Sequence, residues 1–231
     1  EMCIRHRPSW VPDWTVDFSL LQSNAVFLDG LMYRACGSKR ATVSFDAEGG
    51  FTAMGTIIST ILCCTSALDT DPSSVYGITG ANANGTRPYG NSAISTIEAC
   101  RLAILAGLDY DAITGHWHRI YSITCPKAFE AWETSSPKPK TLSATFTMET
   151  VHRTASVNRR FVVLESGYFG FAHQDCKLRD IVVALGGGLV LYVLRSLRTD
   201  RYMFVGTAYI QEMMDGEAFQ DNPHLQDFTI V

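Results

Sequence analysis

The C-terminal third of the chain is a succession of short β-prone runs, and this pattern restricts the fold more than any other feature. Five runs rich in Val, Ile, Leu and aromatic residues follow one another from Arg159 onward: RRFVVLE, YFGFA, DIVVALG, LVLYVLR and RYMFVGTAYI. Glycines and other turn-forming residues separate several of them. Short strands joined by tight turns are typical of antiparallel β-structure. We therefore expect an antiparallel meander or small barrel over residues 158–218.

The N-terminal part of the chain predicts further β-structure. Ala41–Ala47 and Phe51–Ile58 are both β-prone, and they flank the short segment Glu48-Gly49-Gly50. Two such runs around a short glycine-containing gap predict a β-hairpin. Strands from both ends of the chain can therefore contribute to the same β-structure.

The middle of the chain predicts helices. Asn91–Gly107 has apolar residues at helical spacing, and Ser95 and Glu98 fit a capping box. A second helix is expected over Ala112–Tyr121, and a third starts at Pro126, because proline is favoured at the first helical position. Asp69–Gly90 is rich in turn-forming residues and is expected to be a loop.

The order of these regions defines the expected class. β-structure precedes a helical segment, which precedes β-structure again, and this order is typical of an α+β protein. We expect one domain over residues 1–231, with a β segment at 1–62, a central helical insert at 91–133 and the β meander at 158–218. A chain that is 46% hydrophobic and 18% charged can bury a sizeable core.

Composition and motifs argue against several classes of partner and cofactor. The formal net charge is −4 and Lys and Arg are scattered, so no nucleic-acid partner is expected. The seven cysteines form no C-x-x-C pair, which argues against a metal site and a disulfide framework. Gly186-Gly187-Gly188 fits a tight turn rather than a phosphate-binding loop, so no cofactor is expected.

The same features indicate where the protein works. Cysteines with irregular spacing are typical of free thiols in a reducing compartment, which favours a cytoplasmic protein. The first ten residues contain no apolar run typical of a signal peptide. The longest apolar run, Ile181–Leu194, is shorter than the roughly 20 residues of a spanning helix, so membrane insertion is not expected.

Two groups of aromatic and ionisable residues are candidates for a site. Trp10, Asp13 and Trp14 are either a packing anchor or an aromatic wall for an apolar ligand, with Asp13 orienting it. His116 flanks Trp117 and is either a surface histidine or a general acid or base. A helix would place His116 and His118 on different faces, whereas a strand would place them on the same face.

A third candidate group lies in the C-terminal β-rich block. Asp180, Arg195, Tyr209 and Glu217 form either a structural network of ion pairs and hydrogen bonds or the polar rim of a pocket. In the second case Arg195 and Tyr209 would donate hydrogen bonds to a carbonyl or carboxylate of a substrate. The full candidate set assigns Arg195, Tyr209, Asp13 and His116 to catalysis, and Trp10, Trp14, Trp117, His173 and Glu217 to substrate binding.

Three blocks of the sequence resemble one protein family. They are Pro8-Ser9-Trp10-Val11-Pro12-Asp13-Trp14, the stretch from Tyr33 to Ile61, and the stretch from Asn158 to Ala218, which contains Leu185-Gly186-Gly187, Val193-Leu194-Arg195 and Gly216-Glu217-Ala218. This series resembles the region that follows the HET domain in fungal heterokaryon-incompatibility (HET) family proteins. The sequence departs from the family pattern at five positions: Arg179 and Glu212 stand where glycine is common, Leu191 replaces a proline, Thr207 replaces a glutamate, and His173 stands near the usual proline.

The resemblance implies two functions. No segment resembles the HET domain itself, which in the family is associated with cell death after non-self contact. A module without that half is expected to be repurposed as a metal- and cofactor-free cyclase or isomerase, of pericyclic (Diels–Alder) type for example, which folds an apolar fungal secondary metabolite into a reactive geometry. The alternative is a non-enzymatic regulatory or recognition module of an incompatibility protein.

Overall fold

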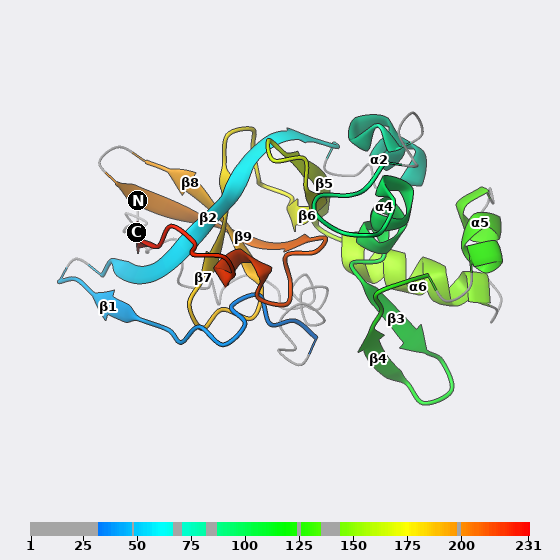
Figure 1. The fold of residues 1–231 in the computed structure, drawn as a ribbon, viewed down its shortest axis with the longest axis horizontal. Helices are drawn as coiled ribbons and strands as arrows, with labels where there is room; N and C mark the ends of the chain where they lie inside the picture. Colours follow the sequence, from blue (N-terminus) through cyan, green and yellow to red (C-terminus); the bar gives the residue numbers. More distant parts are fainter. Residues whose placement is uncertain are drawn as a thin grey trace, which may run out of the picture.

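The computed structural model describes residues 32–47, 49–66, 71–81, 87–123, 126–134, 144–197 and 200–231. Its strands are β1 (Val43–Phe45), β2 (Phe51–Cys64), β3 (Leu108–Asp111), β4 (His116–Arg119), β5 (Arg159–Leu164), β6 (Phe169–His173), β7 (Ile181–Leu185), β8 (Leu191–Ser196), β9 (Arg201–Ile210) and β10 (Gln226–Ile230). Its helices are α2 (Pro72–Thr79), α4 (Thr96–Ile104), α5 (Pro126–Thr134), α6 (Ala144–Ser156) and the short 3-10 helix η3 (Glu217–Phe219). Figure 1 shows the strands of the large sheet on one side of the molecule and the helices with the β3–β4 hairpin on the other.

The large sheet closes into a ring, which confirms the expected α+β barrel-like fold. Its strands are hydrogen-bonded in the order β2-β5-β6-β9-β8-β7, and β7 pairs with β2 again. The long strand β2 makes this closure possible because it pairs with β7 along Gly55–Thr60 and with β5 along Ile61–Cys64. Strand β10 lies off this path and pairs with β2 in antiparallel and with β9 in parallel orientation. Closure leaves few free strand edges.

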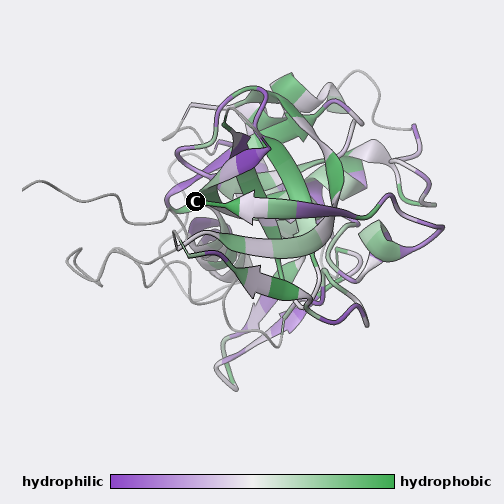
Figure 2. Cartoon of the chain, turned by 90° about the vertical axis from the view of Figure 1, so that its left-hand side faces the viewer, coloured by the Kyte–Doolittle hydropathy of each residue, from purple (hydrophilic) through white to green (hydrophobic). Residues whose placement is uncertain are grey.

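Strands β5, β6 and β7 of the ring are buried on both faces, which explains their nearly continuous apolar sequences. In β7, Val183 packs in a small cluster that includes Phe228 and Ile230 of β10, whereas Val182 and Ala184 pack in the main core. Successive side chains of a strand point to opposite faces, so both faces of β7 must be apolar. Figure 2 shows mostly hydrophobic or neutral residues along the strands and hydrophilic residues gathered in turns and loops.

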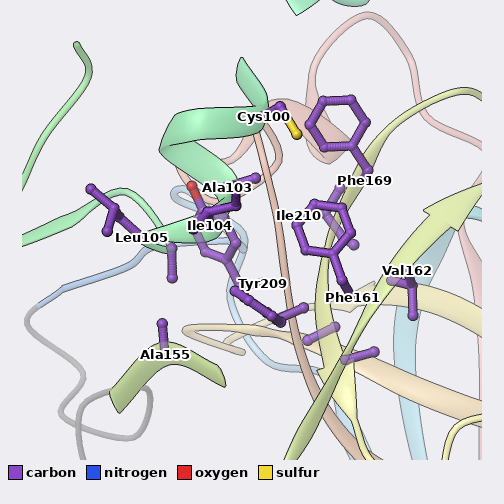
Figure 3. Close-up of a cluster of buried hydrophobic side chains, with 14 of the residues drawn as sticks. Cys100, Ala103, Ile104, Leu105, Ala155, Phe161, Val162, Phe169, Tyr209 and Ile210 are labelled. Atoms are coloured by element: carbon purple, nitrogen blue, oxygen red, sulfur yellow. The ribbon is translucent and has the colours of Figure 1, made fainter. Parts of the chain in front are cut away.

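The helices cover one part of the ring. Helix α4 packs against β6, and α6 packs against β5. Their buried side chains meet those of β5, β6 and β9 in one cluster, in which Tyr209 lies among Ile104, Phe161 and Ile210 (Figure 3). This packing covers the outside of strands β5 and β6 and places the end of β9 near the helical side of the molecule.

Several expected elements are confirmed. The β1–β2 hairpin pairs Val43 with Ala53, and all five C-terminal runs form strands. Helix α4 begins where the capping box predicts, because the Ser95 hydroxyl oxygen accepts a hydrogen bond from the Glu98 backbone N–H at 3.3 Å. Helix α5 begins at Pro126 as expected. The division into one domain with segments 1–62, 91–133 and 158–218 stays a prediction.

Two expected elements are wrong. Residues 112–121 form the turn and second strand of the β3–β4 hairpin rather than a helix. The Asp111 side chain accepts hydrogen bonds from the backbone N–H groups of Ile113 and Thr114, and Gly115 has a φ of +72°, so this segment is a tight turn. Within the expected loop, residues 72–79 form α2, because Asp71 caps it and Pro72 occupies its first turn.

The remaining general expectations concern cysteines, metals and membranes. The cysteines within the described ranges, Cys36, Cys63, Cys64, Cys100 and Cys176, are free thiols. In the same part of the chain, His, Cys, Asp and Glu side chains do not gather in groups suited to a metal ion. No helix formed by the described residues is both long and apolar enough to cross a membrane.

Candidate functional site

Buried Asp180 and partly exposed Arg195 form an ion pair that ties the segment before β7 to β8. The Arg195 Nε and Nη2 atoms donate to the two Asp180 carboxylate oxygens at 2.8 Å each, and Nη2 also donates to the Asp175 carbonyl at 2.8 Å. The Lys177 backbone N–H donates to Asp180 as well. The hydrogen bonds that Arg195 donates to the Asp180 carboxylate raise the pKa of Arg195. Both charges are therefore occupied within the protein, and the pair fits a structural role.

A pocket lies elsewhere, where β9 ends. It has a volume of about 440 Å³. Its walls come from the residues after β9, from η3 and the turn after it, and from two segments of the helical region. The lining residues are Asn91, Ser92, Arg119, Ile120, Tyr121, Tyr168, Gln211, Glu212, Met213, Asp215, Glu217, Gln220 and Asp221.

A close contact between two glycines fixes the turn that carries Asp215 and Glu217 of this pocket. Gly216 has a φ of +100°, and a Cβ atom at this position would lie 2.7 Å from the Gly37 Cα atom. Only glycine allows the two backbones to approach this closely. The Arg34 backbone N–H donates to the Met214 carbonyl at 2.9 Å beside this contact. The turn that carries Asp215 and Glu217 is thereby fixed against the segment after Tyr33.

Arg119 fixes the opposite side of the same turn. Its Nη2 atom donates to the Asp215 carboxylate at 3.0 Å, and its guanidinium lies 4.7 Å from the centre of the Tyr33 ring. The Glu217 carboxylate accepts a hydrogen bond from the Asp215 backbone N–H at 2.7 Å. These contacts hold Asp215 and one oxygen of Glu217 in place.

Gln211 lies at the pocket between Tyr209 and the open space. It is 8% exposed, and its side-chain oxygen accepts a hydrogen bond from the Tyr209 hydroxyl at 2.5 Å. The Gln211 backbone N–H donates to the Phe169 carbonyl at 3.0 Å, and the Gln211 carbonyl accepts a hydrogen bond from the Tyr89 hydroxyl at 3.3 Å. Across the described part of the chain, the Gln211 amide nitrogen makes no hydrogen bond. This nitrogen reaches solvent, so it is a donor available to a ligand in the pocket.

Glu212 adds a carboxylate to the same pocket from a strained backbone position. It has a φ of +62°, in the left-handed region that favours glycine. Burial raises its pKa, a hydrogen bond with Ser92 opposes this change, and the negative charge of Glu217 raises the pKa further. Strained backbone residues often cluster at functional sites. Glu212 is also one of the two positions at which the resemblance to the HET family implies a glycine and this sequence has a side chain. The other, Arg179, has a φ of +72°.

The structure separates the residues proposed from the sequence. Glu217 lines the pocket, and Tyr209 lies directly behind Gln211, where burial raises the pKa of its hydroxyl. Arg195 belongs to the ion pair with Asp180 instead. Trp10, Asp13 and Trp14 lie outside the described residues. The catalytic and binding roles assigned to all of these residues stay predictions.

The three remaining residues also lie away from the pocket. His116 is exposed on β4, on the same face as His118, whose Nε2 atom lies 3.8 Å from Asp109. Trp117 faces the other way and packs against Tyr110 at 5.0 Å. His173, at the end of β6, lies 3.6 Å from Asp175, and burial lowers its pKa. None of the three lines the pocket.

Sequence reasoning did not propose Gln211, Arg119 or Tyr168. Nothing in their local sequence marks them, because the pocket forms only when distant segments meet. The one available signal was Glu212, whose side chain replaces a glycine common in the family.

The fold and the pocket together define a small β-barrel domain with a helical layer and a polar pocket at the end of one strand. Residues 136–231 match the model of the Het-6 beta-barrel domain, which is consistent with the resemblance to the C-terminal region of heterokaryon-incompatibility proteins. The matched stretch contains β5–β10 and the pocket residues from Tyr168 to Asp221. No curated protein and no solved structure matches the chain significantly.

Proposed function

We propose that the chain is a non-enzymatic recognition module of a heterokaryon-incompatibility protein, and that the pocket after β9 is its binding site. The Gln211 amide carries this proposal, because its nitrogen is a solvent-reaching donor at the pocket without a protein partner among the described residues. A hydrogen bond from this donor to a bound acceptor would stabilise the complex by about 0.5–1.5 kcal/mol. The Het-6 beta-barrel domain match to residues 136–231 supports the incompatibility context.

The composition of the pocket also favours binding over covalent catalysis. No histidine or cysteine belongs to its described lining, which instead offers fixed donors, carboxylates and the rings of Tyr121 and Tyr168. Binding sites typically combine such convergent polar groups with aromatic surface. The pocket is open and charged, whereas a cyclase for an apolar substrate needs a closed apolar chamber.

A peptide-binding experiment tests the proposal. The full chain is incubated with an immobilised library of random acetylated hexapeptides, and bound protein is quantified. We expect a subset of peptides to bind saturably, and Ser92→Trp, which fills the pocket, to abolish this binding. Ser166→Trp introduces the same side chain on an exposed turn that does not line the pocket, and it should leave binding unchanged. The absence of any binder, or equal binding by Ser92→Trp, would refute the proposal.

A cofactor-free enzyme is the second candidate, and the raised pKa of Glu212 favours it. A carboxyl group that keeps its proton nearer to neutral pH can act as a general acid on a bound substrate. In this case the pocket would act as the cyclase or isomerase site for an apolar secondary metabolite. Incubation with an apolar metabolite extract from the source organism, followed by mass spectrometry, should reveal a conversion that Glu212→Gln abolishes. Identical metabolite profiles with wild type and variant would remove this candidate.

A further inference from the structure

We infer that the pocket after β9 receives an arginine side chain from a segment of a partner protein, an inference that rests on the proposed recognition function. The observations that carry it are the imbalance of charge in the pocket, the free donor of Gln211 and the aromatic rings at the rim.

The charge of the pocket calls for a cation. Four carboxylates line it, from Glu212, Asp215, Glu217 and Asp221, and Arg119 is the one basic side chain among the lining residues. The Arg119 guanidinium is already paired with Asp215 and stacked on Tyr33. Within the described residues, neither Glu212 nor Asp221 forms an ion pair. An entering cation would therefore offset repulsion that the free pocket contains.

The Gln211 amide favours a hydrogen-bond acceptor close to that cation. Its nitrogen is a donor and cannot bind a guanidinium or ammonium group directly, so it needs an acceptor such as a carbonyl oxygen. An arginine residue within a peptide offers both groups, a guanidinium for the carboxylates and a main-chain carbonyl for Gln211. A volume of about 440 Å³ leaves room for main chain beside one side chain. This combination favours a peptide segment over an isolated cation.

The tyrosines distinguish arginine from lysine. Tyr121 and Tyr168 both line the pocket. The Arg119 guanidinium already lies 5.3 Å from the centre of the Tyr121 ring, so the partly exposed Tyr168 offers the ring on which an incoming guanidinium can stack. A planar guanidinium stacks on aromatic rings and binds carboxylates in bidentate geometry, whereas an ammonium group does neither as well. The strained backbone at Glu212 fits the same picture, because a functional carboxylate explains why a side chain occupies a left-handed position.

A matched set of peptides tests the inference. The labelled peptides acetyl-Gly-Gly-X-Gly-Gly-amide carry arginine, lysine or the neutral isostere citrulline at X, and fluorescence anisotropy measures their binding to the full chain at low salt. We expect the arginine peptide to bind about tenfold more tightly than the citrulline peptide and several-fold more tightly than the lysine peptide. The double variant Glu212→Gln/Asp221→Asn should weaken arginine binding about tenfold or more.

The control is Asp227→Asn, which removes a carboxylate from the exposed face of β10, outside the pocket, and should change the affinity by less than about twofold. Equal affinity for the arginine and citrulline peptides, equal affinity for arginine and lysine, or an unchanged affinity in the double variant would each overturn the inference. Library peptides that bind in a manner sensitive to Ser92→Trp but without arginine would overturn it and leave the proposed function standing. A library without any such binder would refute the proposed function as well.

Discussion

The ring carries two groups of charged residues that differ in how completely the protein satisfies them. In the Asp180–Arg195 group, both carboxylate oxygens accept hydrogen bonds from Arg195, and a backbone carbonyl completes the contact. In the pocket after β9, carboxylates outnumber guanidinium groups, and the Gln211 amide nitrogen has no protein partner among the described residues. The carboxylates of both groups lie in the matched Het-6 beta-barrel stretch, whereas Arg119 of the pocket lies before it.

The difference separates a structural role from a binding role. A charge whose partners all come from the protein stabilises the fold and has nothing left to offer a ligand. A polar group that the fold leaves without a protein partner is available to bind a ligand. Variants of the first group should therefore change stability alone, whereas variants of the second should change binding.

The largest effect is expected from Asp180→Ala. The variant leaves Arg195 without its carboxylate partner and the Lys177 backbone N–H without its acceptor, so it should lower the free energy of unfolding by about 3 kcal/mol. Urea unfolding measures this loss. Peptide binding under conditions where the variant is folded should stay unchanged. A loss below about 1 kcal/mol would mean that the pair is not the structural tie we describe.

Gly216→Ala should have the next largest effect, about 2 kcal/mol, because it adds a backbone clash to a left-handed conformation. Gly167→Ala is the matched control: Gly167 has a φ of +87°, but a Cβ atom there would meet nothing within 4 Å. Thermal or urea unfolding of both variants isolates the contribution of the close approach to Gly37. Gly216→Ala should also weaken peptide binding, and equal destabilisation by the two variants would contradict the packing we describe.

Removing the strained side chains should stabilise the protein. Arg179→Gly and Glu212→Gly each relieve a positive φ, and each should raise the free energy of unfolding by about 0.5–1 kcal/mol. Only Glu212→Gly removes a pocket carboxylate, so only this variant should weaken binding of the arginine peptide. If the two variants bind the peptide equally well, Glu212 has no part in recognition.

The smallest expected effect concerns pH. The folded-state pKa of Glu212 is raised above its ordinary value of 4.5, so the folded protein holds this proton more tightly than the unfolded chain. Wild type should therefore lose stability relative to Glu212→Gln as the pH rises from about 4.5 through the folded-state pKa. Urea unfolding of both proteins at about pH 4 and about pH 7 measures the difference. If the wild type instead gains stability relative to Glu212→Gln as the pH rises over this range, the result would contradict the raised pKa of Glu212.

Local pattern predicted the elements of this fold better than it predicted their contacts. The C-terminal strands and α4 follow directly from apolar spacing and capping residues, and the same reasoning anticipated a barrel. The turn at Asp111 overrode a helical pattern through side-chain hydrogen bonds, which propensity does not capture. Strand β10 and helix α6 were not anticipated, because their short or mixed sequences acquire apolar partners only in the folded protein.

The site was harder to predict for the same reason. The sequence indicated Glu217 and placed Tyr209 in the same polar group, but it could not show that Arg195 belongs to a closed pair. Gln211 and Arg119 are separated by 91 residues between Ile120 and Ile210, and only the closed ring and the β3–β4 hairpin bring them to one pocket. Glu212 could have been proposed from its glycine-type position alone.

The most direct test of the central claim follows the Gln211 side-chain amide itself. Nuclear magnetic resonance can record the side-chain amide resonances of Gln211, assigned with a Gln211→Asn variant, during titration with the arginine pentapeptide. We predict that these resonances shift progressively and saturate at the peptide concentration that saturates anisotropy, and that Ser92→Trp removes the shift. Peptide binding with unmoved Gln211 amide resonances would contradict the account, because the open donor would then not be the recognition group.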